Sequence, residues 1–352
     1  MESGTKPTSP DESEELDEVE IIRTTSYHRR DWDQAVAIPS TNPYDHHEVR
    51  SLLLQNIHTT DSSLGNLQFL PREIVTDICS RLDIRSLMNF RHVNRCARQI
   101  ARETRRYEAV VTHASKALCV ALSTNVAAWF TMSDIFKALC TKNCDFCGGF
   151  GGFLFLPSFP SLMRCCFACI RRDRLPILLH FAVMKKRLRF SPGCLISPSQ
   201  GFLHRPKPAV RTLPGIYSMT RNVRNKGFYV IPELFLNLEY LREEDYGAVV
   251  APSNNSELIR YMVTTPFPYL DIRSGSTQNG ISCCGCQVSV EKGLHLRNVP
   301  SDTFTMRDKV YSHEEFMEHF RGCEEAQRIW KLSKEGFEIT TLSKWISRGG
   351  CF

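Results

Sequence analysis

Two Cys-x-x-Cys pairs constrain the fold of this chain more than any other feature of its sequence. The pairs are Cys144 with Cys147 and Cys166 with Cys169, and 18 residues lie between them. This spacing is typical of a four-cysteine structural zinc site, because each pair turns two thiolates toward one point and two pairs complete a tetrahedron. Gly148, directly after the first pair, allows the backbone to fold tightly there. The sequence therefore predicts a structural zinc site in this segment.

Other cysteines leave the ligands of this first site open. Cys165 could replace Cys166, with a less usual spacing, and Cys140 is a further competitor; the alternative to a metal site is a cluster of buried thiols. The chain has 15 cysteines, an odd number, and its polar, acidic start does not resemble a signal peptide. We therefore expect a reducing compartment, cytoplasm or nucleus, and no disulfide framework. Since no open coordination position with a general base is evident, the expected role of zinc is structural.

A second, more widely spaced group of metal ligands follows near the C-terminus. It combines a Cys-x-x-Cys pair with a histidine and a cysteine four residues apart: Cys283, Cys286, His319 and Cys323. The last two share one face of a helix that the capping box Ser312–Glu315 is expected to begin. Gly285 is expected to permit a tight turn, and the alternation in Gln287–Glu291 predicts a strand. Because Cys284 and His313 compete, a core histidine among unrelated thiols stays open as the alternative.

Residues 70–105 predict three short helices in succession. Pro71 is tolerated in a first turn, where its missing N–H would be unpaired, and Ile74 and Ile78 begin an apolar stripe. Asp83 and Asn94 are the expected caps of the second and third helices. Helices this few and short bury little core by themselves, so we expect them to leave an apolar face for another protein, the alternative being an ordinary core segment.

The same segment resembles the F-box over roughly residues 67–110. The residues that carry the resemblance are Leu70, Pro71, Glu73, Ile74, Leu82, Leu87 and Val93. The resemblance implies docking on the Skp adaptor of an SCF-type ubiquitin ligase, and through it on the cullin ligase core. It assigns that contact to hydrophobic residues of the first helices, namely Leu70, Pro71, Ile74, Ile78, Leu82 and Leu87.

Residues 1–64 are predicted to be a disordered acidic tail. Asp11–Glu20 holds seven carboxylates in ten residues, too little apolar surface to offset the entropy of ordering. Residues 1–50 carry a net charge of −7 within a total of +6, so the remainder carries +13, including a basic cluster at Lys185–Arg189. The longest apolar run, residues 150–163, contains two prolines and is too short to span a membrane, so no membrane contact is expected. After the tail we expect an F-box over residues 65–113 and a cysteine-rich, zinc-braced, substrate-binding domain over residues 114–352.

The organisation of residues 67–332 also resembles a family of filamentous-fungal F-box proteins. The matching motifs are Cys-x-x-Cys-Gly, Arg-Cys-Cys-Phe-x-Cys-Ile, Leu213–Tyr217 and the block from Tyr311 to Trp330. The resemblance implies one integrated domain after the F-box. The expected fold class is mainly α with small β elements (α+β), a three-helix F-box followed by a zinc-stabilised C-terminal domain.

Two classes of function fit these features. The first is a non-catalytic substrate-recognition adaptor of an SCF-type ubiquitin ligase, whose C-terminal domain binds an unknown protein substrate. The second is a zinc-dependent nucleic-acid-binding regulatory protein, suggested by the basic excess, although basic residues are more often a solvated surface. The sequence contains no nucleophile elbow, phosphate-binding glycine loop or His-Glu-x-x-His motif, and no tandem repeats that would indicate the substrate.

Overall fold

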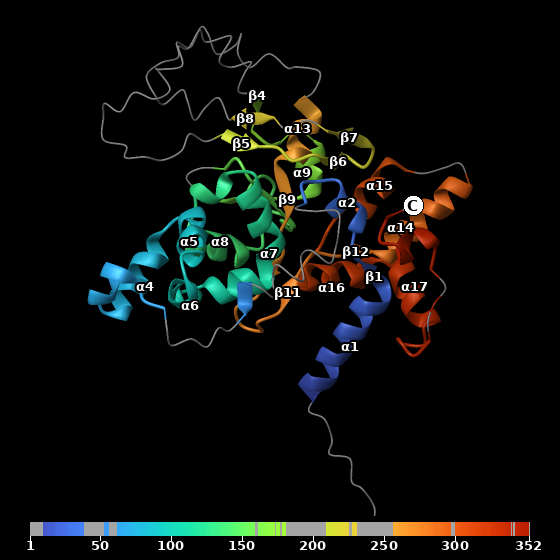
Figure 1. The fold of residues 1–352 in the computed structure, drawn as a ribbon. Helices are drawn as coiled ribbons and strands as arrows, with labels where there is room; N and C mark the ends of the chain where they lie inside the picture. Colours follow the sequence, from blue (N-terminus) through green and yellow to red (C-terminus); the bar gives the residue numbers. More distant parts are fainter. Residues whose placement is uncertain are drawn as a thin grey trace, which may run out of the picture. The chain divides into compact units, whose positions relative to one another are not determined.

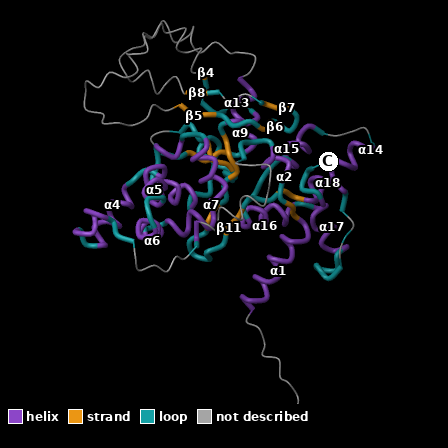
Figure 2. Tube along the Cα trace, in the orientation of Figure 1, coloured by secondary structure: helices purple, strands orange, loops and turns teal. Residues whose placement is uncertain are grey.

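The fold is mainly helical, with short strands (Figures 1 and 2). The strands pair in sheets of two or three. This is the α+β class that the sequence predicts. The structure is a computed structural model, and it describes residues 10–38, 53–55, 62–158, 161–172, 174–176, 178–180, 209–224, 227–230, 256–296, 300–338, 340 and 342–351. None of the helices in these ranges is both long and apolar enough to cross a membrane.

The chain divides into two compact units that differ from the predicted domains. The central unit is Asp33–Thr277, and the terminal unit combines Met1–Trp32 with Gln278–Phe352. The segment predicted to be the F-box and the first cysteine cluster therefore belong to one unit, while the second cysteine cluster belongs to the other. The predicted boundaries, residues 65–113 and 114–352, stay a prediction.

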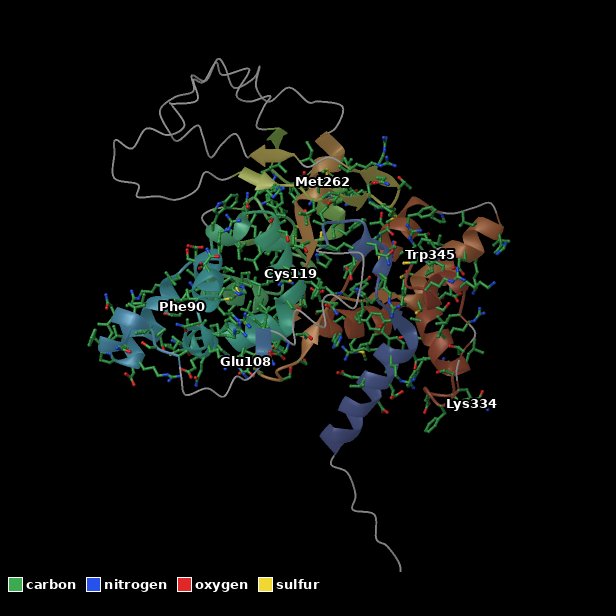
Figure 3. All side chains as sticks on the ribbon, in the orientation of Figure 1. Phe90, Glu108, Cys119, Met262, Lys334 and Trp345 are labelled. Atoms are coloured by element: carbon green, nitrogen blue, oxygen red, sulfur yellow. The ribbon has the colours of Figure 1, made fainter. Side chains whose placement is uncertain are left out.

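The central unit contains a series of helices, two of which begin at the caps that the sequence predicts. The helices are η1 (Gly65–Phe69), α4 (Arg72–Arg81), α5 (Ile84–Arg91), α6 (Arg95–Glu103), α7 (Tyr107–Ser123), η2 (Val126–Ala128), α8 (Met132–Leu139), α9 (Phe167–Arg171) and α13 (Ser256–Met262). The side chain of Asp83 accepts a hydrogen bond from the Ser86 backbone N–H at the start of α5, and Asn94 does the same for Ala97 in α6. Both caps confirm the expected ends. Figure 3 labels Phe90 on α5, a half-buried ring.

Short antiparallel strands complete the central unit. They are β2 (Phe153–Phe155), β3 (Met163–Cys165), β4 (Leu179–His180), β5 (Ala209–Arg211), β6 (Gly215–Tyr217), β7 (Arg221–Val223), β8 (Phe228–Val230), β9 (Thr264–Pro266) and β10 (Tyr269–Leu270), which pairs with β11 (Thr277–Gln278). The sheet β3-β2-β9 brings Phe153 opposite both Cys165 and Pro266. Every residue of β2 is buried, so this strand lies in the core and holds the segment that contains the first cysteine cluster.

The terminal unit pairs segments from the two ends of the chain. Its elements are α1 (Pro10–Thr25), β1 (Ser26–Tyr27), β12 (Ser282–Cys283), α14 (Cys284–His295), α15 (Ser301–Arg307), α16 (His313–Gly322), α17 (Glu324–Leu332) and α18 (Lys344–Ser347), and α2 (Arg30–Gln34) begins in it. Strand β1 is antiparallel to β12, with Ser26 opposite Cys283. Trp345, labelled in Figure 3, packs beside the buried side chains of Tyr27 and Ile346.

Two expectations about this unit are wrong. Residues 10–38 are not a disordered tail but form α1, β1 and α2, with Tyr27 and Trp32 buried. The acidic composition led to the prediction of disorder, although apolar residues follow the carboxylate run. Two of them, Ile21 and Ile22, pack against the C-terminal segment. Gln287–Glu291 is not a strand but part of α14. Five alternating residues are too few to distinguish a strand from a buried helix turn.

The basic cluster at Lys185–Arg189 lies outside the described residues.

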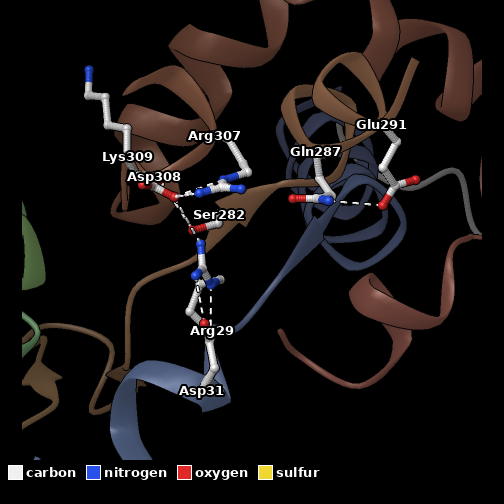
Figure 4. A network of polar contacts seen from close by, with 8 residues as sticks. All are labelled: Arg29, Asp31, Ser282, Gln287, Glu291, Arg307, Asp308 and Lys309. Atoms are coloured by element: carbon white, nitrogen blue, oxygen red, sulfur yellow. Dashed lines mark hydrogen bonds and ion pairs between the residues drawn. The ribbon is translucent and has the colours of Figure 1, made fainter. Parts of the chain in front are cut away.

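A buried ion-pair network joins the two ends of the chain inside the terminal unit (Figure 4). The guanidinium of Arg29 donates to both carboxylate oxygens of Asp31, at 2.8 and 2.6 Å, and to Asp308 at 3.3 Å. Arg307 contacts the same Asp308 oxygen at 2.7 Å. Arg29 also lies over the ring of Trp32, 4.0 Å from its centroid. Because each buried charge has an opposite charge beside it, the network fixes residues 29–32 against residues 307–308.

Candidate functional site

The first cysteine cluster has the geometry of a tetrahedral zinc site. The four predicted sulfurs, those of Cys144, Cys147, Cys166 and Cys169, lie within 4.8 Å of one another. Sγ of Cys144 is 3.8 Å from that of Cys169, and Sγ of Cys147 is 3.6 Å from that of Cys166. A tetrahedron with zinc–sulfur bonds of about 2.3 Å has sulfur–sulfur edges of about 3.8 Å. The competitors Cys165 and Cys140 are not part of this group, so the structure brings together the predicted set.

Local backbone structure aims these sulfurs. After Cys147 the chain turns back through Gly148, whose φ of +76° suits glycine and whose N–H donates to the Cys144 carbonyl at 2.9 Å. Cys166 is the cap of α9, and the Cys169 backbone N–H points at the Cys166 sulfur at 3.4 Å. N–H groups aimed at sulfur favour the thiolate form, which is the form that binds metal.

The charge state of the cluster also favours a cation. A hydrogen bond from the Cys166 thiol lowers the pKa of Cys144 to about 5. Burial, together with the nearby Cys144 thiolate, raises the pKa of Cys169 to about 12. Cys144 therefore ionises readily while Cys169 resists a second negative charge, and a divalent cation between them would remove that resistance.

Arg164 ties this cluster to the core of the central unit. Its guanidinium is buried and donates to four backbone carbonyls: Gly151 at 2.7 Å, and Ala138, Pro268 and Phe267 at 2.9 Å each. Burial lowers the pKa of Arg164 to about 10, so the side chain stays charged at neutral pH. Because its own backbone lies two residues before Cys166, Arg164 ties the second cysteine pair to α8 and to the segment that follows β9. Sequence reasoning missed this role, since an isolated arginine carries no signal for burial.

The second predicted set also comes together, in the terminal unit. The ligand atoms of Cys283, Cys286, His319 and Cys323 lie within 4.8 Å of one another. The competitors Cys284 and His313 are not part of this group. Metal binding at either cluster remains a prediction, but both have the donor set and the spacing that it needs. No disulfide joins any of the described cysteines.

An exposed apolar surface on η1 and α4 is the other candidate site. We call it the exposed apolar face, and it consists of Leu67, Phe69, Leu70, Ile74 and Ile78. Phe69 is 81% exposed, and Ile74 and Ile78, one helical turn apart, are 49% and 45% exposed. Pro71 is exposed as well and Leu82 is half-buried. Side chains of this size and number on consecutive elements are typical of a surface that binds another protein.

Leu87 does not belong to this face, contrary to the prediction. Its side chain is 1% exposed, because α5 turns it into the core of the central unit beside Ile84 and Met88. The F-box resemblance assigned Leu87 to the partner contact, but the helix that Asp83 caps has its own inward side, and Leu87 lies on it. Sequence reasoning also missed Leu67 and Phe69, which precede the predicted helix and show no periodic signal.

An exposed ion pair connects α4 with α6. Arg72 binds both carboxylate oxygens of Glu103, at 2.8 and 2.6 Å. The hydrogen bond to Glu103 also raises the pKa of Arg72. On the inner side of α4, Val75 and Cys79 are buried. The helix therefore has two faces with different environments, one inside the unit and one in solvent.

Comparison with known protein families identifies an F-box domain at residues 67–108. The matched segment contains the whole exposed apolar face and the helices α4, α5 and α6. No curated protein and no solved structure matches the chain. The comparisons thus support the F-box resemblance, whereas nothing in them supports the fungal family or assigns either cysteine cluster.

Proposed function

We propose that this chain is a non-catalytic substrate-recognition adaptor of an SCF-type ubiquitin ligase. In this role the F-box domain docks on the Skp adaptor, which connects it to the cullin ligase core. The observation that carries the proposal is the exposed apolar face, which lies within the F-box domain while the other side of α4 is buried. The contact is assigned to Leu67, Phe69, Leu70, Pro71, Ile74 and Ile78, with Leu82 at its edge.

The remainder of the chain, residues 114–352, has the second part of this role, which is to hold a protein substrate. We propose that zinc at the four-cysteine site braces it, because four thiolates at tetrahedral spacing prefer a borderline-soft divalent ion. Arg164 supports the same idea, since it links the cysteine segment to α8 and to the residue after β9 through backbone carbonyls. The zinc would be structural, because four sulfur ligands leave no position for a reacting group.

Binding of nucleic acid is the weaker candidate. The basic cluster that suggested it, Lys185–Arg189, lies outside the described residues, and no observation in the described ranges favours it. We therefore keep the adaptor role as the proposed function.

Calorimetric titration of the full chain with the Skp adaptor tests this proposal. Replacing Ile74→Asp and Ile78→Asp together puts two charges into the proposed contact, where each buried isoleucine would contribute about 1.5–3 kcal/mol. The double variant should bind at least about 100-fold more weakly than the wild type. Its thermal unfolding midpoint should change little, because both side chains are already half exposed.

The matched control is Ile272→Asp, an exposed isoleucine outside the F-box domain. It should bind the Skp adaptor as the wild type does. If the double variant binds as tightly as the control, the docking assignment is wrong, and if the wild type itself does not bind, the adaptor role is wrong.

A further inference from the structure

The terminal unit contains a metal-ligand cluster built from segments far apart in the sequence. Sγ of Cys283 is 3.8 Å from Sγ of Cys323, and Sγ of Cys286 is 3.3 Å from Nε2 of His319. A tetrahedral zinc ion bound to sulfur at about 2.3 Å and nitrogen at about 2.0–2.1 Å sets these edges near 3.8 and 3.6 Å. The cluster is therefore already arranged as a three-cysteine, one-histidine site.

Helix positions explain why these four groups converge. Cys283 caps the start of α14 and Cys286 lies in its first turn, whereas His319 is in the last turn of α16 and Cys323 is the extended residue between α16 and α17. The capping box of Ser312 fixes the start of α16, as the sequence predicts. Each ligand thus comes from a helix end.

Close approach of α14 and α17 is necessary for this arrangement. A Cβ atom on Gly285 would lie 2.3 Å from the backbone nitrogen of Ala326. This distance is too short for any side chain, so only glycine fits at this position. Gly285 is therefore needed because a neighbouring helix passes against it, and not for the tight turn that the sequence suggested. It lies inside α14, between the two cysteines of the pair.

The ring of His319 is also held in place. It stacks on the ring of Tyr311, with centroids 4.7 Å apart and an angle of 21° between the planes. Tyr311 in turn exchanges two backbone hydrogen bonds with Ile281, which directly precedes β12. One histidine nitrogen is thus aimed at the sulfurs by groups that belong to both sides of the cluster, as is usual for metal-binding histidines.

The N-terminal segment lies against this cluster. Ser26 of β1 pairs with the ligand residue Cys283, and Ile21 and Ile22 of α1 pack on the core that includes Cys283, Cys286, Phe316 and Phe320. Without an ion, the ligand side chains on these helix ends are joined to one another only by weak thiol and imidazole contacts. With an ion, metal bonds join those ends, and the surface on which α1 packs becomes fixed.

We propose that Cys283, Cys286, His319 and Cys323 bind one zinc ion, and that this ion holds α1 and β1 to the C-terminal segment. Three thiolates and one neutral imidazole give the bound site a net charge of −1, suited to a borderline-soft divalent cation. Removing this ion should release the N-terminal segment. This proposal goes beyond the adaptor role and does not depend on it.

Metal analysis of the full chain tests the first half. The wild type should hold two zinc ions per chain, and Cys323→Ser should hold one. The matched control is Cys284→Ser, which changes a buried cysteine next to a ligand residue but outside the cluster, and should retain two. If Cys323→Ser retains two ions, or if Cys284→Ser loses one, the ligand assignment is wrong.

Hydrogen exchange of α1 tests the second half without disturbing this cluster. In the full-length variant Cys147→Ser the first site is incomplete, so cobalt added to the metal-free protein should fill one tetrahedral site, seen in the ligand-field absorption of cobalt thiolate. Amide exchange in α1 should slow by about tenfold or more as that site fills. If cobalt binds and exchange in α1 stays fast, the coupling is refuted.

Two glycine variants provide a check that leaves every ligand in place. Gly285→Ala should lower metal occupancy of this site and speed exchange in α1, because α17 must move away from α14. Gly322→Ala, beside the ligand Cys323 but with open space at its Cβ, should do neither. Equal occupancy in the two variants would overturn the claim that α14–α17 contact shapes the site.

Discussion

Ile74 and Val75 are consecutive residues of α4, yet the first is 49% exposed and the second is 2% exposed. The inner side of the helix contributes to the core of the central unit, and the outer side contributes nothing to it. Large apolar residues on a solvent-exposed helix face do not stabilise the fold of the free chain. This contrast is the physical basis for assigning the outer side to a partner protein.

Stability and binding should therefore respond to different residues of the F-box domain. Leu87→Ala empties a buried position and should lower the free energy of unfolding by about 2–5 kcal/mol. Ile74→Ala removes a half-exposed side chain, so it should cost stability about 1 kcal/mol or less and instead weaken Skp binding. Urea denaturation and calorimetric titration of both variants measure the two effects. Equal losses of stability would contradict the two-sided description of these helices.

The ligand choice at the first cluster can be checked by paired substitutions. Cys166→Ser should remove one zinc ion per chain, because the Cys166 sulfur is one of the four that converge. Cys165→Ser should keep that ion, because Cys165 lies outside the group, although a hydroxyl in its buried position should cost some stability. Metal analysis of purified full-length protein distinguishes them. Loss of zinc from Cys165→Ser alone would reverse the assignment.

Arg164 should be among the most sensitive positions of the central unit. Arg164→Met would leave buried carbonyls of Gly151, Ala138 and Phe267 without their donor, at a cost of about 3–5 kcal/mol in all. The variant should also lose zinc from the four-cysteine site more readily to a chelator. Arg172→Met, an exposed arginine nearby, serves as the control and should change neither quantity. Wild-type stability in Arg164→Met would show that water can replace the guanidinium.

The buried network in the terminal unit gives a similar prediction. Arg29→Met removes the cation between Asp31 and Asp308, which are both buried. An uncompensated buried carboxylate is costly, so the unfolding free energy of this unit should fall by about 3–5 kcal/mol. The loss should shrink if Asp31→Asn is added, because the second change removes the unpaired charge. Thermal unfolding of the single and double variants measures this coupling, and simple additivity would argue against a direct interaction.

Local signals in the sequence predicted local structure well. The caps Asp83, Asn94 and Ser312 depend on residues three positions apart, and the first cysteine cluster depends on residues at most 25 positions apart. The structure places both as expected. The pairing of Ser26 with Cys283 depends on residues more than two hundred positions apart, and no local pattern indicates it. Because this long-range pairing is invisible in the local sequence, the acidic composition of the N-terminal segment predicted disorder where α1 packs.

For the same reason, the sequence analysis did not predict the roles of residues that depend on tertiary packing. Gly285 reads as a turn glycine until the backbone of Ala326 is placed against it. Nothing in the local sequence indicates that Arg164 is buried among four carbonyls. The F-box resemblance assigns Leu87 to the partner contact, whereas the packing of α5 places it in the core. Period and spacing fix which side chains share a helix face, but not which face meets the core.

The most direct test of the adaptor role is the hydrogen-exchange footprint of the Skp adaptor on the full chain. The account predicts that adding the adaptor slows exchange in η1 and α4, residues 65–81, where the exposed apolar face lies, and leaves α14 and α16 unchanged. Slowed exchange at α14 or α16 with none at residues 65–81 would contradict it.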